Sequence, residues 1–575
     1  MCPTVQIPSV VTTNLTMDTQ VDQGSTDLDL IIRNGRIRKV TSLDILQLGV
    51  DLGIKDGKIQ SVGQCLEAGP RTEIVDAQGA YITPGGVDSH VHIQQDNSPT
   101  GDTWETGSRS AIAGGNTTVI AFATQKRQEA SIWPALQAYH DKATGNSYCD
   151  YGFHLILTNP NDRVLEDELP RLVDYEGIPS IKLYMTYEPM KLGDGDLFNV
   201  MMKTRSLGIT TMIHAENSDM IEQITKRLAQ RGNTSTFLHS IARPQIAEAE
   251  ATYRAISLAE VTDAPILLVH MSAPAALDHV RAAQARLLPI HAETCPHYLY
   301  LLSDRLRSGP DDFKGAKSIC APPLRHNTRD LDAIWMGLAN GTFTVVSSDH
   351  APATFDHPCG KMKGLVQSAG EKGEPHQHQQ RQQASKGDFR NVPNGLPGIE
   401  TRLPLLYDRT FDPSRSGCGG AEDDKIRIPL TRFVEVTSTN PAKLYGLGGR
   451  KGSLLPGYDA DIVIWYPEDP PLVSVSEADG SGSPSGTAYR KRKITITNSM
   501  LHHRIDYTPF EGIEVRNWPR WVFLRGKRVW DRDNGGVTGE KGDGRFLKRG
   551  KSTILTGQMG RTGMGMMKGE QSYWR

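Results

Sequence analysis

The sequence predicts an α/β fold: a (β/α)8 barrel of the TIM type with a smaller β-sandwich domain formed from both ends of the chain. Three observations lead to this prediction. Short apolar runs alternate with longer helical segments through the middle of the chain, which is the pattern of a parallel sheet with crossover helices. β-hairpin signals stand before and after that region. The length of 575 residues exceeds what one average domain needs.

Two hairpin signals follow the N-terminal segment. LDLIIRNGRIRKV (28–40) and DLGIKDGKIQSVG (51–63) alternate apolar and polar residues around Asn-Gly and Asp-Gly, the dipeptides that favour two-residue β-turns. Residues 1–27 are rich in Thr, Ser, Gln and Asp and predict a flexible N-terminus. We therefore expect the first part of the β-sandwich domain at 28–82.

Eight apolar runs in the middle of the chain predict the barrel strands. They are 81–92, 116–123, 153–159, 179–185, 209–216, 264–272, 288–295 and 343–350. The segments between them, such as PQIAEAEATYRAISLAEVT (244–262), carry helix formers at amphipathic spacing and are long enough to cross over. We predict the barrel over 83–450, with a low-complexity polar insertion at 364–390.

β-rich sequence returns near the C-terminus. GYDADIVIWYP (457–467) and WPRWVFLRGKRVWD (518–531) predict the second part of the β-sandwich domain, which we place at 451–545. A second polar insertion interrupts it at 476–493. Residues 546–575, which become rich in Gly and Met, are expected to form a C-terminal arm.

Composition excludes several classes of partner. A formal net charge of −2 gives no electrostatic reason to bind nucleic acid or an anionic membrane. The 7 cysteines include no C-x-x-C pair, which argues against a disulfide framework or a cysteine-based zinc site and favours a reducing compartment. The N-terminus lacks the features of a secretory signal, and no window approaches the apolar length of a membrane span. We therefore expect a cytoplasmic protein with a small neutral substrate.

Side chains that can bind a metal stand near the ends of five predicted strands. They are His90 and His92, Lys182, His214, His270 and Asp349. Because the carboxyl ends of barrel strands meet at one mouth, we expect these side chains to lie together there. His90 and His92 are two positions apart in an extended strand and therefore project the same way. Imidazole and carboxylate groups suit Zn²⁺, so the set predicts a metal centre.

Lys182 is unusual at the end of an apolar strand, because its ammonium would repel metal ions and is costly to bury unpaired. A lysine that loses its proton on burial can react with CO₂ to give a carbamate. The carbamate is an anionic ligand whose two oxygens can bridge two ions. Taken alone, such a lysine more often reaches solvent or pairs with a carboxylate. Its place between the His-x-His pair and the later histidines favours the bridging role.

These residues lie in blocks that resemble the dihydropyrimidinase and D-hydantoinase branch of the amidohydrolase superfamily, in order and along nearly the whole chain. The blocks are GGVDSHVH, AGGNTTVIAFA, SIKLYMTY, IHAEN, LLVHMSAP, AETCPHYL, CAPPLR, SSDHAP, VPNGLPGIE, NPAKLYGL, GYDADIVIW and HHRIDYTPFEG. The resemblance implies a metal-dependent cyclic amidohydrolase.

The resemblance also implies how two zinc ions would be held in each subunit. One ion resembles that bound by His90, His92, N6-carboxylated Lys182 and Asp349. The other resembles that bound by the same Lys182 together with His214 and His270. A hydroxide would bridge the two ions, which lower the pKa of bound water and polarise the scissile carbonyl.

Further roles carry over to single residues. Asp349 would act as general acid and base, and Tyr187 would donate a hydrogen bond to the developing oxyanion. Asn394 resembles the residue whose backbone binds the amide edge of the ring. Ala321 stands where the family usually has a serine. If the contact is made by the main chain, as the resemblance suggests, alanine can serve; if a hydroxyl is used, the substrate preference would shift.

The resemblance leaves the ring itself open. The rim segments after His92 and Tyr187 are polar, with Asp96, Asn97 and Lys191 where enzymes for bulky aryl-hydantoins tend to be apolar. This favours a small or polar substrate such as 5,6-dihydrouracil, which would give N-carbamoyl-β-alanine. A 5-substituted hydantoin, giving an N-carbamoyl amino acid, is the other substrate that we consider.

Alternative functions on the same fold are an allantoinase or dihydroorotase and a non-catalytic scaffold similar to the collapsin-response mediators. Tyr187 argues against the first two, and a dihydroorotase should also offer a cation to the substrate carboxylate. Scaffold relatives have lost metal ligands, whereas every expected ligand is present here. The family resemblance further implies a homotetramer, or a dimer.

Overall fold

A closed parallel barrel forms the centre of the computed structural model, which describes residues 27–38, 46–309, 312–365, 387–411, 426–468 and 493–554. Eight strands pair in parallel in the order β13-β12-β11-β10-β9-β8-β7-β6. A parallel bridge between Val91 and His350 joins the first strand to the end of the last. The predicted (β/α)8 barrel is therefore confirmed. The strands are β6 (Gly86–Val91), β7 (Asn116–Thr124), β8 (Asp150–Ile156), β9 (Ser180–Tyr184), β10 (Thr210–His214), β11 (Ile266–Leu268), β12 (Ile290–Thr294) and β13 (Val345–Val346).

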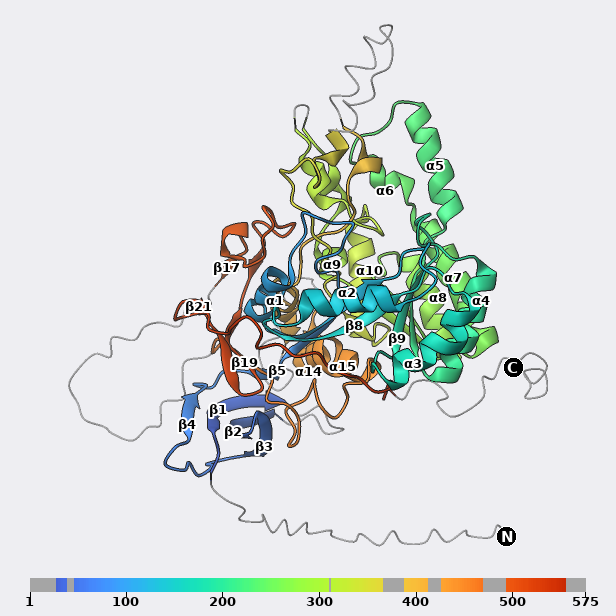
Figure 1. Cartoon of the computed structure of the whole chain (residues 1–575). Helices are drawn as coiled ribbons and strands as arrows, with labels where there is room; N and C mark the ends of the chain where they lie inside the picture. The colour runs from blue at the N-terminus through green and yellow to red at the C-terminus, as the bar shows by residue number, and fades with distance from the viewer. Residues whose placement is uncertain are drawn as a thin grey trace, which may run out of the picture.

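Helices surround the barrel and cover its outer face (Figure 1). Local sequence fixes several of their ends: α1 begins at a capping box of Thr103 and Thr106, and α4 ends at Gly208 in the left-handed conformation. The helices are α1 (Trp104–Ala113), α2 (Trp133–Ala143), α3 (Leu169–Asp174), α4 (Asp194–Leu207), α5 (Ser218–Gln230), α6 (Leu238–Ala242), α7 (Gln245–Thr262), α8 (Pro274–Ala285), α9 (Pro296–Tyr300), α10 (Thr328–Ala339), α13 (Arg402–Asp408), α14 (Leu430–Val434) and α15 (Asn440–Leu444). Short 3-10 or π-helical turns are η1 (Val164–Glu168), η2 (Ser303–Leu306), η3 (Lys314–Ser318), η4 (Phe389–Asn391), η5 (Glu435–Thr439) and η6 (Asn498–Met500).

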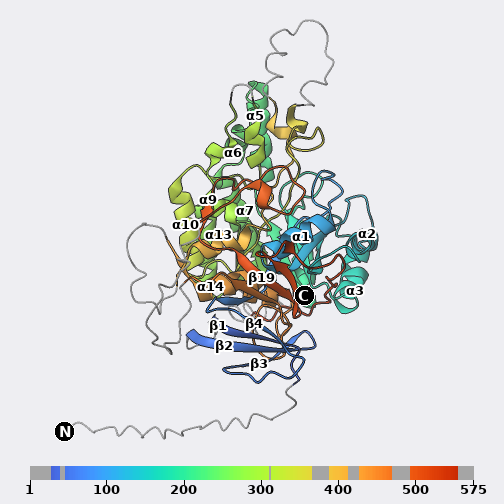
Figure 2. The same cartoon turned by 90° about the vertical axis from the view of Figure 1, so that its left-hand side faces the viewer.

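Two further sheets form the predicted β-sandwich from both ends of the chain. The first has the order β3-β2-β1-β4, and the second has the order β21-β20-β19-β16-β5, so that an N-terminal strand lies among C-terminal ones. Apolar side chains of both sheets, including Ile32, Leu52, Ile462 and Phe523, form one core. In Figures 1 and 2 the first of these sheets lies at the end of the molecule opposite α5. Its strands are β1 (Leu30–Arg38), β2 (Leu46–Lys55), β3 (Lys58–Gly63), β4 (Glu73–Asp76), β5 (Ile82–Pro84), β16 (Ile462–Trp465), β19 (Pro519–Leu524), β20 (Lys527–Asp531) and β21 (Gly536–Val537).

The remaining strands form two short pairs. They are β14 (Thr410–Phe411) with β15 (Ile428–Pro429), and β17 (Ile494–Thr495) with β18 (Glu514–Val515).

The single strand predicted over 81–92 is two strands in different sheets. β5 pairs with β16 of the sandwich, whereas β6 pairs with β7 of the barrel. The chain changes sheet at Gly85, where a Cβ atom would lie only 2.1 Å from the Thr117 hydroxyl. A glycine is required at this crossing because no larger residue fits.

A buried ion cluster joins the sandwich to the barrel. The Lys451 ammonium lies 2.7 Å from Asp150 at the start of β8, 2.7 Å from Asp461 and 3.0 Å from Asp459. Although burial opposes the charge, these carboxylates raise the pKa of Lys451 above its ordinary value. Removing one member of such a cluster leaves an uncompensated buried charge, so the cluster fixes the sandwich against the barrel.

The C-terminal residues 546–554 run along the start of two barrel strands. Phe546 forms a parallel bridge with Tyr151 of β8. The buried guanidinium of Arg549 donates to the Ser180 hydroxyl at the start of β9, at 3.0 Å. Because β9 carries Lys182, this segment supports the strand that holds the candidate bridging residue.

Several predicted segments lie outside the described residues. They are nearly all of 1–27, most of the insertions 364–390 and 476–493, and residues 555–575. The predicted domain boundaries therefore stay a prediction.

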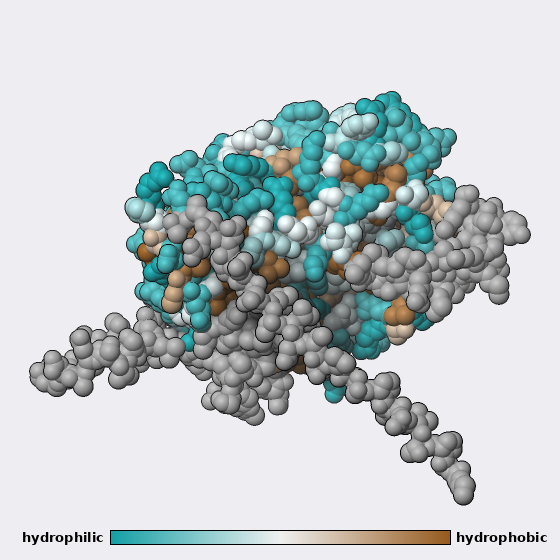
Figure 3. Space-filling model, turned by 90° about the horizontal axis from the view of Figure 1, so that it is seen from below, coloured by the Kyte–Doolittle hydropathy of each residue, from teal (hydrophilic) through white to brown (hydrophobic). Residues whose placement is uncertain are grey.

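Within the part of the chain that the structure describes, no helix has the length and apolar character needed to cross a membrane. Seen from below, the coloured surface is largely hydrophilic, with hydrophobic residues in scattered patches (Figure 3).

Candidate metal centre

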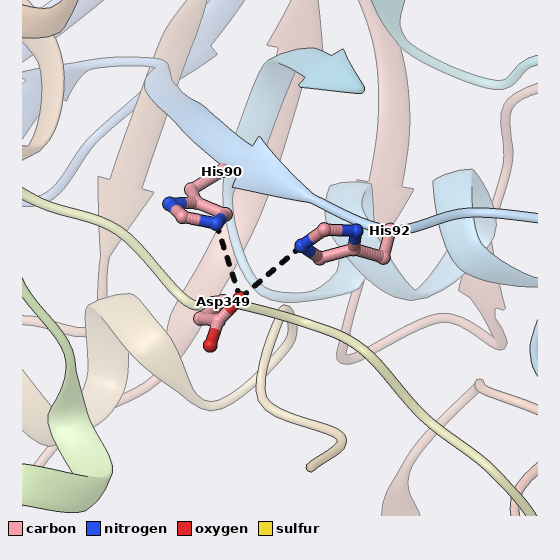
Figure 4. A group of neighbouring side chains, drawn as sticks. All are labelled: His90, His92 and Asp349. Carbon is pink, nitrogen blue, oxygen red and sulfur yellow. Dashed lines mark ion pairs between the residues drawn. The ribbon is translucent and has the colours of Figure 1, made fainter. Parts of the chain in front are cut away.

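Three predicted ligands converge at the barrel mouth. His90 and His92 come from the end of β6, and Asp349 follows β13. One carboxylate oxygen of Asp349 lies 3.2 Å from His90 Nε2 and 3.4 Å from His92 Nε2. Figure 4 shows both histidine rings directed at Asp349. The donor atoms of these three residues all lie within 4.8 Å of one another. Two imidazoles and a carboxylate at this spacing can hold one divalent cation.

Lys182 enters the same group from β9. Its amine lies 2.8 Å from His90 Nε2 and faces the rings of Phe122 and Tyr184 at 4.7 and 5.1 Å. Burial lowers the pKa of Lys182 to about 8, although Asp349 and Glu293 oppose the shift. A larger fraction of this amine is therefore neutral near pH 7 than in an ordinary lysine, and the neutral form is the one that reacts with CO₂.

His214 and His270 complete the group on the other side. Their ring centroids are 4.4 Å apart, and His270 lies 5.4 Å from His90. His270 Nδ1 is buried and has no hydrogen-bond partner among the described residues. A buried polar atom without a partner is costly. A metal ion bound to this nitrogen would satisfy it, because imidazole nitrogen is a common metal ligand. The four histidines, Lys182 and Asp349 thus fit a centre for divalent cations.

Electrostatics favour metal-binding protonation states in this group. Burial raises the pKa of Asp349, but the interaction with His90 and the hydrogen bond from His92 outweigh it, so the pKa lies well below its usual range. Burial, reinforced by Lys182, lowers the pKa of His90 well below its ordinary value. An ionised carboxylate and a neutral imidazole are the forms that bind metal.

Backbone strain accompanies three of the site residues. Tyr187, His270 and Asp349 have positive φ angles of 68°, 39° and 45°. Such conformations cost of order 1–3 kcal/mol each and persist where the surrounding structure determines them. The strain therefore supports a functional role for the loops that follow β9, β11 and β13.

Two carboxylates that the sequence reasoning missed orient the histidines. Glu293 of β12 contacts His90 Nδ1 at 2.6 Å, and Glu216 contacts His214 Nε2 at 2.7 Å. Arg243 binds Glu216 and lies over the Tyr187 ring, at 5.1 Å from the centroid. An acidic residue two positions after a strand-end histidine, as in IHAE, was the only local signal for Glu216. Glu293 pairs with a residue far away in the sequence.

The predicted substrate residues lie beside this group. The Tyr187 ring is 5.4 Å from the His214 ring, and the Asn394 amide donates to the Tyr187 hydroxyl at 2.9 Å. Ala321 precedes a cis peptide bond to Pro322, and its segment is joined to that of Asn394 because Gly395 N donates to Ile319 O at 3.0 Å. The structure thus brings Tyr187, Asn394 and the segment of Ala321 together.

The charged rim residues pair with neighbours. Asp96 accepts a hydrogen bond from Lys142 at 2.6 Å, and Lys191 forms an ion pair with Glu188. The rim is therefore polar, as the sequence indicates, but the charges of Asp96 and Lys191 are balanced by their neighbours Lys142 and Glu188.

Replacing Glu293 with glutamine should weaken metal binding by about 10- to 100-fold, because the partner of a ligating histidine fixes its orientation and basicity. The side chain keeps its size, so the variant tests the carboxyl group itself. Metal affinity is measured by competition with a chromophoric chelator. Glu222→Gln on α5, which removes an ion pair with Lys226 at the surface, serves as the control. Equal affinities for both variants and the unmodified protein would contradict the role of Glu293.

Comparisons with known proteins relate the whole chain to a family and to solved structures. The model of the amidohydrolase family matches residues 81–529. The chain is 38% identical to the D-hydantoinase of Ralstonia pickettii over 527 residues, covering 91% of this chain and 99% of that protein. It is 34% identical to a D-phenylhydantoinase of Escherichia coli, covering 90% and 98%. The solved dihydropyrimidinase of Brevibacillus agri superimposes with a TM-score of 0.76 at 33% identity, covering 91% and 99%.

Proposed function

Since the chain belongs to the amidohydrolase family, among the hydantoinases and dihydropyrimidinases, we propose that it hydrolyses the ring amide of 5,6-dihydropyrimidines or 5-substituted hydantoins with the aid of two zinc ions. As a cyclic amidohydrolase it is an enzyme, and its family and the group of His90, His92 and Asp349 indicate that it depends on a metal. The identity and number of the ions, the residue roles and the ring preference belong to the proposal, as does assembly into a homotetramer.

One observation carries the proposal. The amine of Lys182 is buried beside His90, in contact with the cluster of metal-competent side chains, and among the described residues it forms no ion pair. A structural lysine at such a depth would be expected to have a carboxylate or several carbonyl oxygens as partners, whereas the amine of Lys182 contacts the imidazole of His90. A lysine that becomes a carbamate ligand needs metal-binding side chains around it. Lys182 has such neighbours, since its amine contacts His90 in the group of candidate ligands.

We assign the residues to the two ions as follows. One ion would be held by His90, His92, carboxylated Lys182 and Asp349, and the other by the same Lys182 with His214 and His270. When bound, the ions supply Lewis acidity, which acidifies a water molecule and polarises the scissile carbonyl. The orphaned Nδ1 of His270 and the carboxylates behind His90 and His214 support this donor set.

The chain's own residues would then move the proton and bind the developing charge. Asp349 accepts a proton from the attacking water, whose oxygen bonds to the carbonyl carbon. Tyr187 donates a hydrogen bond to the oxygen that becomes negative. Asp349 next delivers the proton to the ring nitrogen as the carbon–nitrogen bond breaks. The product is a ureido acid, which from dihydrouracil is N-carbamoyl-β-alanine.

The polar rim favours a small or polar ring. Asp96 and Lys191 stand in local ion pairs at the loops after β6 and β9, and a bulky aryl substituent would have to desolvate such groups. Relatives named D-phenylhydantoinase show that aryl-hydantoins are accepted elsewhere in the family. We therefore expect dihydrouracil to be hydrolysed faster than 5-phenylhydantoin.

The test compares hydrolysis of dihydrouracil, hydantoin, 5-phenylhydantoin, allantoin and dihydroorotate before and after metal removal. We expect the rings of dihydrouracil and the hydantoins to be opened. This activity should be lost after chelation and should return when zinc is added. Metal per chain is measured on the same samples by mass spectrometry of the elements. Hydrolysis that survives complete metal removal would contradict the mechanism, and a preference for allantoin or dihydroorotate would contradict the substrate class.

A further inference from the structure

We propose that Lys361 is a positioning residue for the substrate, whose buried ammonium fixes the two backbone segments around Ala321 and Asn394 that receive the ring. This inference rests on the proposed function, because it assumes that these segments bind a cyclic amide. It adds a residue outside the metal centre, on the loop that follows Asp349.

Lys361 binds three backbone carbonyls. Its Nζ donates to Ile319 O at 2.9 Å, to Pro393 O at 2.7 Å and to Gly395 O at 2.7 Å. Three acceptors match the three N–H groups of an ammonium. The side chain is fully buried, and within the described part of the chain no carboxylate forms an ion pair with it. The charge is thus balanced by carbonyl dipoles alone.

The acceptors belong to the two segments that flank the proposed substrate contacts. Ile319 lies two residues before Ala321, and Pro393 and Gly395 stand on either side of Asn394. The same ammonium therefore sets the distance between the two segments. The backbone of Lys361 is itself anchored, since its N–H donates to Thr354 O at 2.8 Å, on the loop that begins at Asp349.

The carbonyl contacts also determine where the opposite peptide groups point. In a trans peptide unit the C=O and N–H are directed to opposite sides. Drawing the Pro393 carbonyl toward Lys361 therefore turns the N–H of Asn394 away from the lysine. A positive charge on the carbonyl also polarises the peptide, which strengthens the N–H as a donor. That N–H is the group that would bind the amide edge of the ring.

Neighbouring side chains fix the rest of the Ala321 segment in the same manner. His239 Nε2 contacts Cys320 O at 2.7 Å, and the Tyr298 hydroxyl donates to Pro322 O at 2.6 Å. Among these contacts only Lys361 reaches both segments. Burial lowers the pKa of Lys361 to about 7, although Cys320 opposes the shift; the three carbonyl oxygens around Nζ are the geometry that an ammonium requires.

The experiment compares steady-state kinetics of the metal-loaded protein with Lys361→Met, which keeps the length of the stem, and Lys361→Gln, which keeps an N–H donor. Lys363→Met is the control, because Lys363 is exposed two residues further on. We expect kcat/KM to fall on the order of 100-fold in Lys361→Met, as a misplaced contact does, through a rise in KM that reflects weaker substrate binding, with a smaller rise in Lys361→Gln. The metal content and kcat should stay close to those of the unmodified protein.

A merely structural lysine would instead lower the active fraction, which reduces kcat at an unchanged KM. That result, or a KM within twofold of the unmodified protein in a folded, metal-loaded variant, overturns the proposal for Lys361 and leaves the proposed function intact. Absence of hydrolysis in the unmodified protein would overturn both. If Lys361→Met does not fold, the KM of Lys361→Gln decides alone.

Discussion

Replacement of Lys182 by alanine should reduce kcat/KM for cyclic amide hydrolysis by at least about 1,000-fold, equivalent to ~4 kcal/mol of transition-state stabilisation. The reason is that the variant loses the proposed bridging ligand and with it the charge that holds two cations among four histidines. Metal per chain should fall in parallel. Both quantities are measured on the same preparation, by initial rates and by elemental mass spectrometry.

Two controls separate the amine from the bulk of the side chain. Lys182→Met keeps an apolar side chain of similar length beside the Phe122 and Tyr184 rings, which the amine faces, so it should fold and still lose metal and activity. Lys203→Met, which removes a surface ion pair with Glu166, should leave both unchanged. Full activity with retained metal in Lys182→Ala would rule out the carbamate.

The carbamate can also be tested without mutation. Its formation consumes CO₂ and an unprotonated amine and releases a proton, so metal-free protein given zinc in CO₂-free buffer should recover little activity until bicarbonate is added. Recovery that is independent of bicarbonate would contradict a bridge made from Lys182.

Asp349→Asn should lower kcat by about 100- to 10,000-fold, the range that general acid–base catalysis supplies. The amide keeps the shape of the carboxylate but cannot take a proton from water or return it to the ring nitrogen. It also removes the negative charge that lies between His90 and His92, so weaker binding of one metal is expected as well. The measurement is kcat at saturating substrate, with metal content determined alongside.

The control for this variant is Asp332→Asn on the exposed side of α10, which should behave as the unmodified protein does. Assays at high zinc distinguish the two roles of Asp349, because excess metal restores occupancy but not proton transfer. An Asp349→Asn variant that regains full kcat under excess zinc would show that the carboxylate acts as a ligand alone.

Much of the fold follows from local sequence. Eight short apolar runs separated by amphipathic segments predict a parallel barrel, and the closed sheet confirms it. The apolar run over 81–92 does not predict its division into β5 and β6, because an apolar run does not indicate the strand with which it pairs. Only the Gly85–Gly86 pair gave a local signal for the break.

The candidate site shows the same division. The spacing of His90 and His92 predicts that both side chains face one way, and both reach the same oxygen of Asp349. Glu293 and Lys361 could not be identified in this way. Each acts on a residue or carbonyl distant in sequence, at separations of 203 residues for Glu293 and His90 and 42 for Lys361 and Ile319.

The sequence by itself therefore determined the barrel, the order in which its strands bring candidate ligands to the mouth, and the family. These depend on periodicity and on strand ends, which are local properties of the chain. Tertiary structure alone decided which carboxylate contacts each histidine, that Lys182 is buried among the candidate ligands with no ion pair to a described residue, and that one lysine joins the two loops proposed to bind the substrate. Those features depend on burial and on distances between remote segments, which arise only when the barrel closes.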